Sequence, residues 1–253
     1  ILNQHGYKVA CQTCHIPSYA KVAATKLRWD WSTAGSLRDG KPYQEVDEAG
    51  NPTYMSTKGS FVWGKDVRPE YTWFNGTASH YLLGDEFDPS QPLVLNPLFG
   101  DYEDPDARIV PVKIHRARQI YDVLNRILIQ PKLFSAAAGD SGYWKEFDWD
   151  RAATAGMNEV GLAYSGSYGF AATEMNWPVN HMVAPKEQAV ACDECHRREG
   201  GRLATLGGFY LPGRDRSRWL DGLGATMLLS TLVAVVLHGG ARLWFRRRRR
   251  GEN

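Results

Sequence analysis

The sequence of 253 residues contains no cysteine outside two pentapeptides. Its four cysteines, Cys11, Cys14, Cys192 and Cys195, all lie in them, so none is left for a structural disulfide or a separate catalytic thiol. The chain also lacks an excess of charge of one sign: the formal net charge is +2, too balanced to suggest a nucleic-acid partner. No EF-hand spacing is present, so the acidic stretch 101–106 is interpreted as a solvated loop rather than a calcium site.

Both pentapeptides have the pattern C-x-x-C-H and run from Cys11 to His15 and from Cys192 to His196. Two thiols at this spacing can form thioether bonds to the vinyl groups of one haem, and the histidine that follows can be an axial ligand of its iron. A zinc site built from two C-x-x-C pairs, or a redox dithiol, is the alternative, but neither needs a histidine after both motifs. The sequence therefore predicts two covalently bound haems c, with His15 and His196 on the iron.

The chain also lacks an export signal, because it begins at Ile1 with no initiator Met and no basic or apolar leader. Haem c is attached outside the cytoplasm. We therefore expect that residue 1 is not the start of the gene product, or that the export information lies elsewhere.

Five further histidines are candidates for the second axial position, and His181 is the strongest. It lies between Pro178 and Pro185, shortly before the second motif. His5, six residues before Cys11, could serve a neighbouring haem or be exposed to solvent. The remaining three are weaker candidates, since such histidines are more often packed or exposed: His80, His115 and His238.

Elsewhere the pattern predicts a mainly α fold with much irregular loop and a few short β-hairpins, organised around haem. Apolar residues fall roughly on one helical face over 112–129, and a second helix is expected over 151–160 with Asp150 as its N-cap. Turn signals in 33–76 predict the hairpins. Lys26 and its basic neighbours in 21–31 could offset haem propionates or form a solvated face.

The C-terminal residues predict one transmembrane helix. Residues 222–237 carry no charge, and the apolar stretch reaches Ala241, near the roughly 20 residues that span a bilayer. Trp219 and Trp244 could lie at the two interfaces, and the arginines at 246–250 predict a cytoplasmic C-terminus with the haem domain outside. A buried core helix with a basic tail is the alternative. His238, inside the stretch, could ligate a haem b, contact a quinone or lie at the interface.

Several runs resemble the C-terminal half of the octahaem tetrathionate reductase family of multihaem cytochromes c. The similarity extends from about residue 5 to residue 213. The runs that carry it are KVACQTCHIP at 8–17, ATK at 24–26, WDWSTAG at 29–35, PEY at 69–71, WFNG at 73–76 and NHMVAPKEQAV at 180–190.

The resemblance implies a periplasmic cytochrome whose haems mostly have two histidine ligands. It also implies one atypical haem with a lysine ligand, where tetrathionate, nitrite or hydroxylamine is reduced. This chain departs from the family because it can attach two haems rather than eight. The other six must come from missing sequence or from a partner chain, so we assign no catalytic residue here.

Two domains and two functions follow as expectations. Residues 1–213 would form a di-haem cytochrome c domain, and 214–253 a juxtamembrane segment, membrane helix and cytoplasmic tail. The chain would pass electrons between a membrane donor, a quinol or a cytochrome b, and the haems of an octahaem-type reductase. Alternatively, it is a pure electron-transfer subunit of a membrane respiratory complex. Expected partners are another haem-bearing segment or cytochrome subunit, the donor and the lipid bilayer.

Overall fold

The computed structural model describes residues 2–251, with side chains from His5 to Arg246. The chain divides into two compact units. The first comprises the residues up to Cys192 together with Thr205–Gly208, and the second comprises Asp193–Ala204 together with the residues from Phe209 onward.

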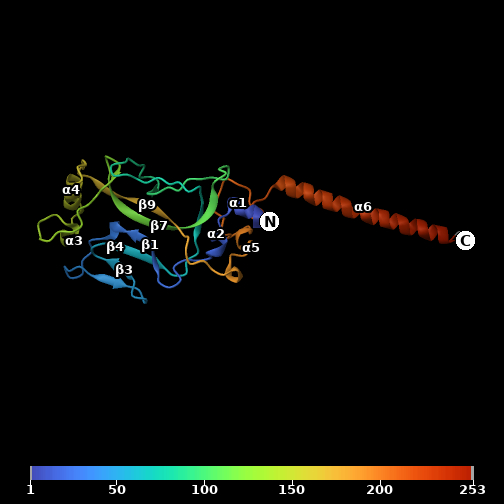
Figure 1. Ribbon diagram of the computed structural model, residues 1–253, viewed down its shortest axis with the longest axis horizontal. Coiled ribbons are helices and arrows are strands. Elements are labelled where there is room, and N and C mark those ends of the chain that lie inside the picture. Colours follow the sequence, from blue (N-terminus) through green and yellow to red (C-terminus); the bar gives the residue numbers. More distant parts are fainter. Residues whose placement is uncertain (1, 252–253) are drawn as a thin grey trace. The chain divides into compact units, whose positions relative to one another are not determined.

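The first unit is built on a mixed nine-stranded sheet rather than on helices (Figure 1). Along its main path the strand order is β2-β3-β4-β1-β7-β9-β6, while β5 and β8 also pair with β7. The prediction of a mainly α fold was therefore wrong. The strands are β1 (Thr25–Asp30), β2 (Gln44–Val46), β3 (Pro52–Met55), β4 (Gly59–Gly64), β5 (Glu70–Phe74), β6 (Leu93–Val94), β7 (Arg108–Asp122), β8 (Ile127–Leu128) and β9 (Tyr168–Pro178).

Strand β7 is the centre of this sheet. It pairs antiparallel with β9 from Val112 opposite Pro178 to Asp122 opposite Tyr168, and parallel with β1. The helix predicted over 112–129 is thus the greater part of β7, a turn and β8. Its β-branched residues, such as Ile109, Val112 and Ile120, are buried along the pleated surface, where branched side chains pack well. The predicted hairpins are present, since β2, β3 and β4 pair antiparallel in succession.

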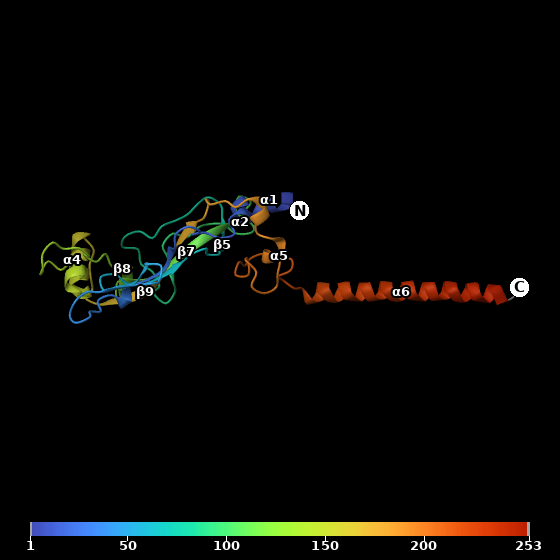
Figure 2. The ribbon, with the colours of Figure 1, turned by 90° about the horizontal axis from the view of Figure 1, so that it is seen from below.

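Helices flank the two ends of the β7–β9 ribbon. Figures 1 and 2 show α1 (Leu2–Lys8) and α2 (Cys11–His15) at one end, and α4 (Trp149–Glu159) at the other, where α3 (Tyr143–Glu146) lies beside it. The predicted second helix is confirmed, but it begins earlier than expected. Its N-cap is Asp148, which accepts a hydrogen bond from the Arg151 amide at 3.0 Å.

The hydrophobic core under α4 holds the end of the sheet that lies away from α2. Its buried members are Ile120, Ile127, Ile129, Tyr143, Trp149, Ala152, Ala153 and Met157. Fully burying a side chain such as Met157 contributes roughly 1.5–3 kcal/mol. Gly156 lets the helix approach the neighbouring chain closely, because a Cβ at this position would lie 1.9 Å from the Gln130 carbonyl oxygen.

The second unit contains the end of α5 (Cys192–Cys195), the loops that follow it and the long helix α6 (Arg218–Gly251). The segment Arg218–Arg246 is long and apolar enough to cross a membrane, with a mean hydropathy of 1.9 in its most apolar stretch. None of that stretch is buried by other described residues.

Candidate haem-binding sites

The first C-x-x-C-H motif forms α2, a short helix fixed to β7 by its central residue. The Thr13 side chain is buried, and its hydroxyl donates to the Ile109 carbonyl at 2.7 Å. The amide of Ala10 donates to the same carbonyl at 3.0 Å. With Thr13 turned toward the protein, Cys11 is exposed and Cys14 half-buried. Positions three apart on a helix lie on the same face, so both thiols can reach one edge of a porphyrin.

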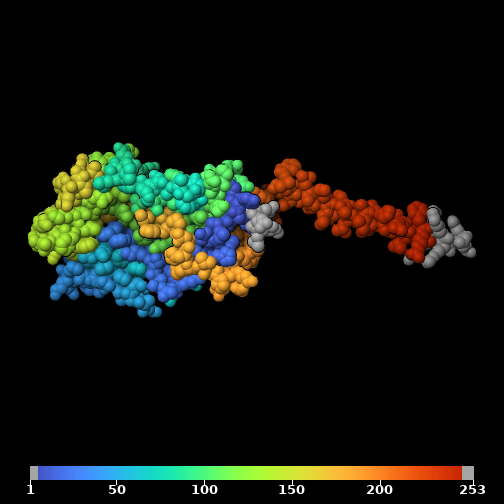
Figure 3. Space-filling model, in the orientation of Figure 1, coloured from blue at the N-terminus to red at the C-terminus, as the bar shows by residue number. Residues whose placement is uncertain are grey.

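His15 is oriented by the segment that leads to the second motif. Its Nδ1 lies 3.4 Å from the Ala184 carbonyl oxygen, while the Ala184 amide donates to the His15 carbonyl at 2.7 Å. The Val190 amide donates to the Cys14 carbonyl at 2.8 Å. In Figure 3 orange atoms of this later segment lie against the blue atoms of the N-terminal residues. A carbonyl at Nδ1 selects the tautomer in which Nε2 is the metal-binding nitrogen.

The thiols of the two motifs influence each other. The pKa of Cys14 is raised, first by burial and then by the charges of Cys192 and Cys11. Cys192 follows two positions after Val190, whose amide donates to the Cys14 carbonyl, so it lies close to the first motif although 178 positions separate it from Cys14 in the sequence.

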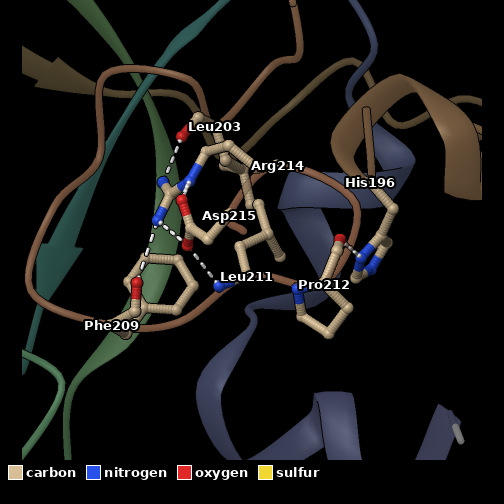
Figure 4. Close-up of polar contacts among 7 residues, drawn as sticks. All are labelled: His196, Leu203, Phe209, Leu211, Pro212, Arg214 and Asp215. Atoms are coloured by element: carbon tan, nitrogen blue, oxygen red, sulfur yellow. Dashed lines mark hydrogen bonds and ion pairs between the residues drawn. The ribbon is translucent and has the colours of Figure 1, made fainter. Parts of the chain in front are cut away.

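The second motif repeats the arrangement on α5. Cys192 is exposed, Cys195 is half-buried, and His196 follows the helix directly. The Nδ1 of His196 lies 2.8 Å from the Pro212 carbonyl oxygen (Figure 4). As at His15, this contact assigns Nε2 to the iron.

The residues of both motifs fit covalently bound haem. No disulfide joins any of the four cysteines, all of which the structure describes. Both ring Nδ1 atoms are placed at backbone carbonyls. Among residues 5–246, no group of three or more His, Cys, Asp or Glu side chains could hold a metal ion.

The distal candidates occupy different surroundings. His181 is exposed and lines an open cavity of about 390 Å³ together with Tyr19, Lys113, Trp177 and Met182. An exposed imidazole at a cavity of this kind is accessible to a planar ligand. His5 lies on α1, one turn before the first motif, and is half-buried. Both remain candidates for the opposite face of a haem.

The three weaker candidates differ from one another. His80 is exposed in a loop, and His238 is exposed on α6. His115 lies on β7 with its Nε2 atom buried and without a hydrogen-bond partner. Burial lowers its pKa, and the charges of Lys113 and Lys26 lower it further, so the ring is held neutral. A neutral imidazole is the form that binds iron.

Lys26 is enclosed by aromatic rings, a setting that the basic pattern of 21–31 does not reveal. Its Nζ lies 4.0 Å from the ring centre of Trp29 and 4.3 Å from that of Phe61. Burial lowers the pKa of this lysine, and Lys58 and Lys113 lower it further. Its charge is therefore satisfied by cation–π contacts within the unit.

Sequence reasoning missed the residues that surround His196. Arg214 and Asp215 form an ion pair at 2.8 Å, and Pro212 supplies the carbonyl at the histidine ring. The sequence shows these residues only as the start of a charged juxtamembrane run. No signal in it indicates which backbone carbonyl the ring will meet.

Comparisons with known proteins agree with this geometry. A family model described as bacterial cytochrome c matches residues 26–199. The solved structure of an octahaem cytochrome c from Shewanella oneidensis is similar, with 49% sequence identity and a TM-score of 0.71. The similarity covers 78% of this chain and 44% of that one, so this chain spans less than half the length of the octahaem protein. A search of curated proteins found no match.

The family match covers more than half of the chain, and the similar structure is a multihaem cytochrome. Haem c, bound covalently, is accordingly the cofactor, and the coarse function is electron transfer through its iron. The resemblance seen in the sequence runs is thereby confirmed. The chain belongs to the bacterial cytochrome c family and is a relative of the octahaem cytochromes c.

Proposed function

We propose that the chain is a membrane-anchored, two-haem module that passes electrons between a membrane donor and further haems of an octahaem-type reductase. The observation that carries this proposal is the pair of C-x-x-C-H motifs, in each of which the Nδ1 of the histidine meets a backbone carbonyl. The similarity to an octahaem protein of more than twice the matched length supports the existence of further haems outside this chain.

One haem would be held by Cys11 and Cys14 with His15 on the iron, and the other by Cys192 and Cys195 with His196. Haem iron supplies a centre that gains and loses one electron. The carbonyls of Ala184 and Pro212 hold the two rings at Nδ1, which would leave each Nε2 available to bind the haem iron. His181 and His5 are the proposed ligands for opposite faces.

Imidazole on both faces would leave no position on the iron for a substrate. This chain alone would therefore conduct electrons, and reduction of tetrathionate, nitrite or hydroxylamine would belong to haems elsewhere in the assembly. The six further haems would lie in preceding sequence or in a partner cytochrome chain. In the second candidate function, a pure electron-transfer subunit, no reductase haems would be present in the assembly at all.

The proposed donor is a quinol, or a cytochrome b, in the membrane. Vesicles that contain the haem-loaded chain should show reduction of both haems when menaquinol is added. Later addition of tetrathionate, nitrite or hydroxylamine should leave the haems reduced, because neither iron offers a site. Vesicles without the chain are the control. Reoxidation of the haems by any of the three compounds would show that this chain is itself a reductase.

Helix α6 is the proposed anchor, and residues 214–253 would form the membrane segment beside a haem domain of residues 1–213. Trp219 is 85% exposed and Trp244 53% exposed at the two ends of the apolar stretch, as expected of interface residues. Arg246 begins the basic run; the side chains of 247–250 lie outside the described residues. By the positive-inside rule the C-terminus is cytoplasmic and the haem domain periplasmic. His238 would lie near the cytoplasmic end, available to a donor.

A cysteine placed after Arg250 tests this orientation. It should resist an impermeant thiol reagent in intact cells, because the arginines keep that end in the cytoplasm, and it should react after the membrane is permeabilised. A cysteine in place of the exposed Ser90 is the matched control and should react in intact cells. Ready labelling of the C-terminal cysteine in intact cells would contradict the orientation.

A further inference from the structure

We propose that Arg214 and Asp215 are positioning residues for His196. They fix the loop whose Pro212 carbonyl accepts a hydrogen bond from the His196 ring, and so set how strongly that ring binds the haem iron (Figure 4). This inference rests on the proposed role of His196 as an axial ligand.

The two side chains form a bidentate ion pair. The Arg214 Nε lies 2.8 Å from Asp215 Oδ1, and Nη2 lies 2.8 Å from Oδ2. The Arg214 side chain is only 12% exposed. Its hydrogen bonds lower the pKa of Asp215 to about 2, so the carboxylate is charged under ordinary conditions. A planar fork of this kind fixes both distance and orientation, which a lysine cannot do.

The Arg214 guanidinium also donates hydrogen bonds to the surrounding backbone. Its Nη1 donates to the Leu203 carbonyl at 2.8 Å, and its Nη2 donates to the Phe209 carbonyl at 2.9 Å. The carboxylate of Asp215 accepts from the Leu211 amide at 2.6 Å. One ion pair therefore closes the loop between Phe209 and Asp215. Figure 4 shows these contacts converging on the ion pair of Arg214 and Asp215, with Pro212 on the side of the loop that meets His196.

The loop also contacts the backbone of His196. Gly213 has a φ of +88°, a conformation that favours glycine, and a Cβ there would lie 2.4 Å from the His196 carbonyl oxygen. The ring and the main chain of His196 are thus both held by a segment of four residues that Arg214 and Asp215 close.

Such a contact has an electronic consequence for a bound metal. A carbonyl that accepts the Nδ1 proton makes Nε2 a stronger donor, and a stronger donor favours ferric over ferrous iron. Weakening the contact should therefore raise the reduction potential of the haem at Cys192 and Cys195. The potential of the haem at Cys11 and Cys14 should not change, because its histidine meets the Ala184 carbonyl instead.

The test is a spectroelectrochemical titration of the two-haem chain with Arg214→Gln. We expect the ferrous-to-ferric ratio of one haem, at a fixed potential, to rise about tenfold, equivalent to 59 mV for one electron. The Arg214→Lys variant, which keeps the charge but not the fork, should show part of this shift. Arg216→Gln is the matched control. That arginine is 65% exposed and 3.6 Å from Asp221, so both potentials should stay unchanged.

The outcomes separate this inference from the function on which it rests. If the reduction potentials of both haems are the same in Arg214→Gln as in Arg216→Gln, the proposed positioning role of Arg214 is wrong. If Arg214→Gln fails to fold, Asp215→Asn decides, since it keeps an acceptor for the Leu211 amide and should give a smaller shift in the same direction. If His196→Ala leaves the spectra of both haems unchanged, His196 is not a ligand and the proposed ligation itself fails.

Discussion

Replacing His181 by alanine should convert one haem from low-spin to high-spin and let it bind carbon monoxide when reduced. Imidazole is a strong neutral ligand, and its loss would open one face of an iron to water. The segment between His181 and Cys192 can span about 33 Å when extended, ample to pass around the edge of a porphyrin. His181 is exposed at a cavity of about 390 Å³ rather than packed in the core, so its removal should not unfold the unit.

Both haems should stay attached in this variant, because attachment uses only the cysteines. Val183→Ala provides the matched control, since Val183 is 64% exposed, two positions away, and carries no ligating atom. The control should remain low-spin and inert to carbon monoxide. A His181→Ala spectrum identical to that of the control would show that His181 is not a ligand. His5, His80 and His115 would then be tested in that order.

The haem motifs and the apolar C-terminal helix were predictable because each depends on a local rule. Covalent attachment of haem requires the spacing seen at Cys11, Cys14 and His15. The thickness of a bilayer sets the length of charge-free sequence that a spanning helix needs. Neither rule needs the tertiary fold. The short hairpins of β2, β3 and β4 followed for the same reason, since their turns lie between neighbouring strands.

The large sheet was not predictable from the same reading. The apolar residues of β7 and of the turn after it fall at spacings that also suit one face of a helix, and Ile120, Tyr121 and Leu124 favoured that interpretation. Whether this segment forms a helix or a strand is decided by β9, which pairs with β7 and lies about 50 positions further along the chain. A window of local sequence does not contain that partner, so long-range pairing overrode the local pattern.

The contacts of His15 and His196 could not be predicted from the sequence, for a different reason. The atoms that orient His15 and His196 are backbone carbonyls, of Ala184 and Pro212, and every residue has such an atom. The identity of a residue therefore does not indicate whether its backbone carbonyl contacts a histidine ring. The role of the ion pair between Arg214 and Asp215 can be inferred only from the structure, which shows which loop the pair closes.

The central claim is that this polypeptide carries two haems c through its two C-x-x-C-H motifs. Intact-mass spectrometry of the purified chain, made in cells that export and mature cytochromes c, tests it most directly. The predicted mass is that of the polypeptide plus two haems. The double variant Cys192→Ser/Cys195→Ser should carry one haem, and so should Cys11→Ser/Cys14→Ser, because each pair of thiols serves one haem. A chain with the bare polypeptide mass, or with zinc in place of haem, would contradict the account.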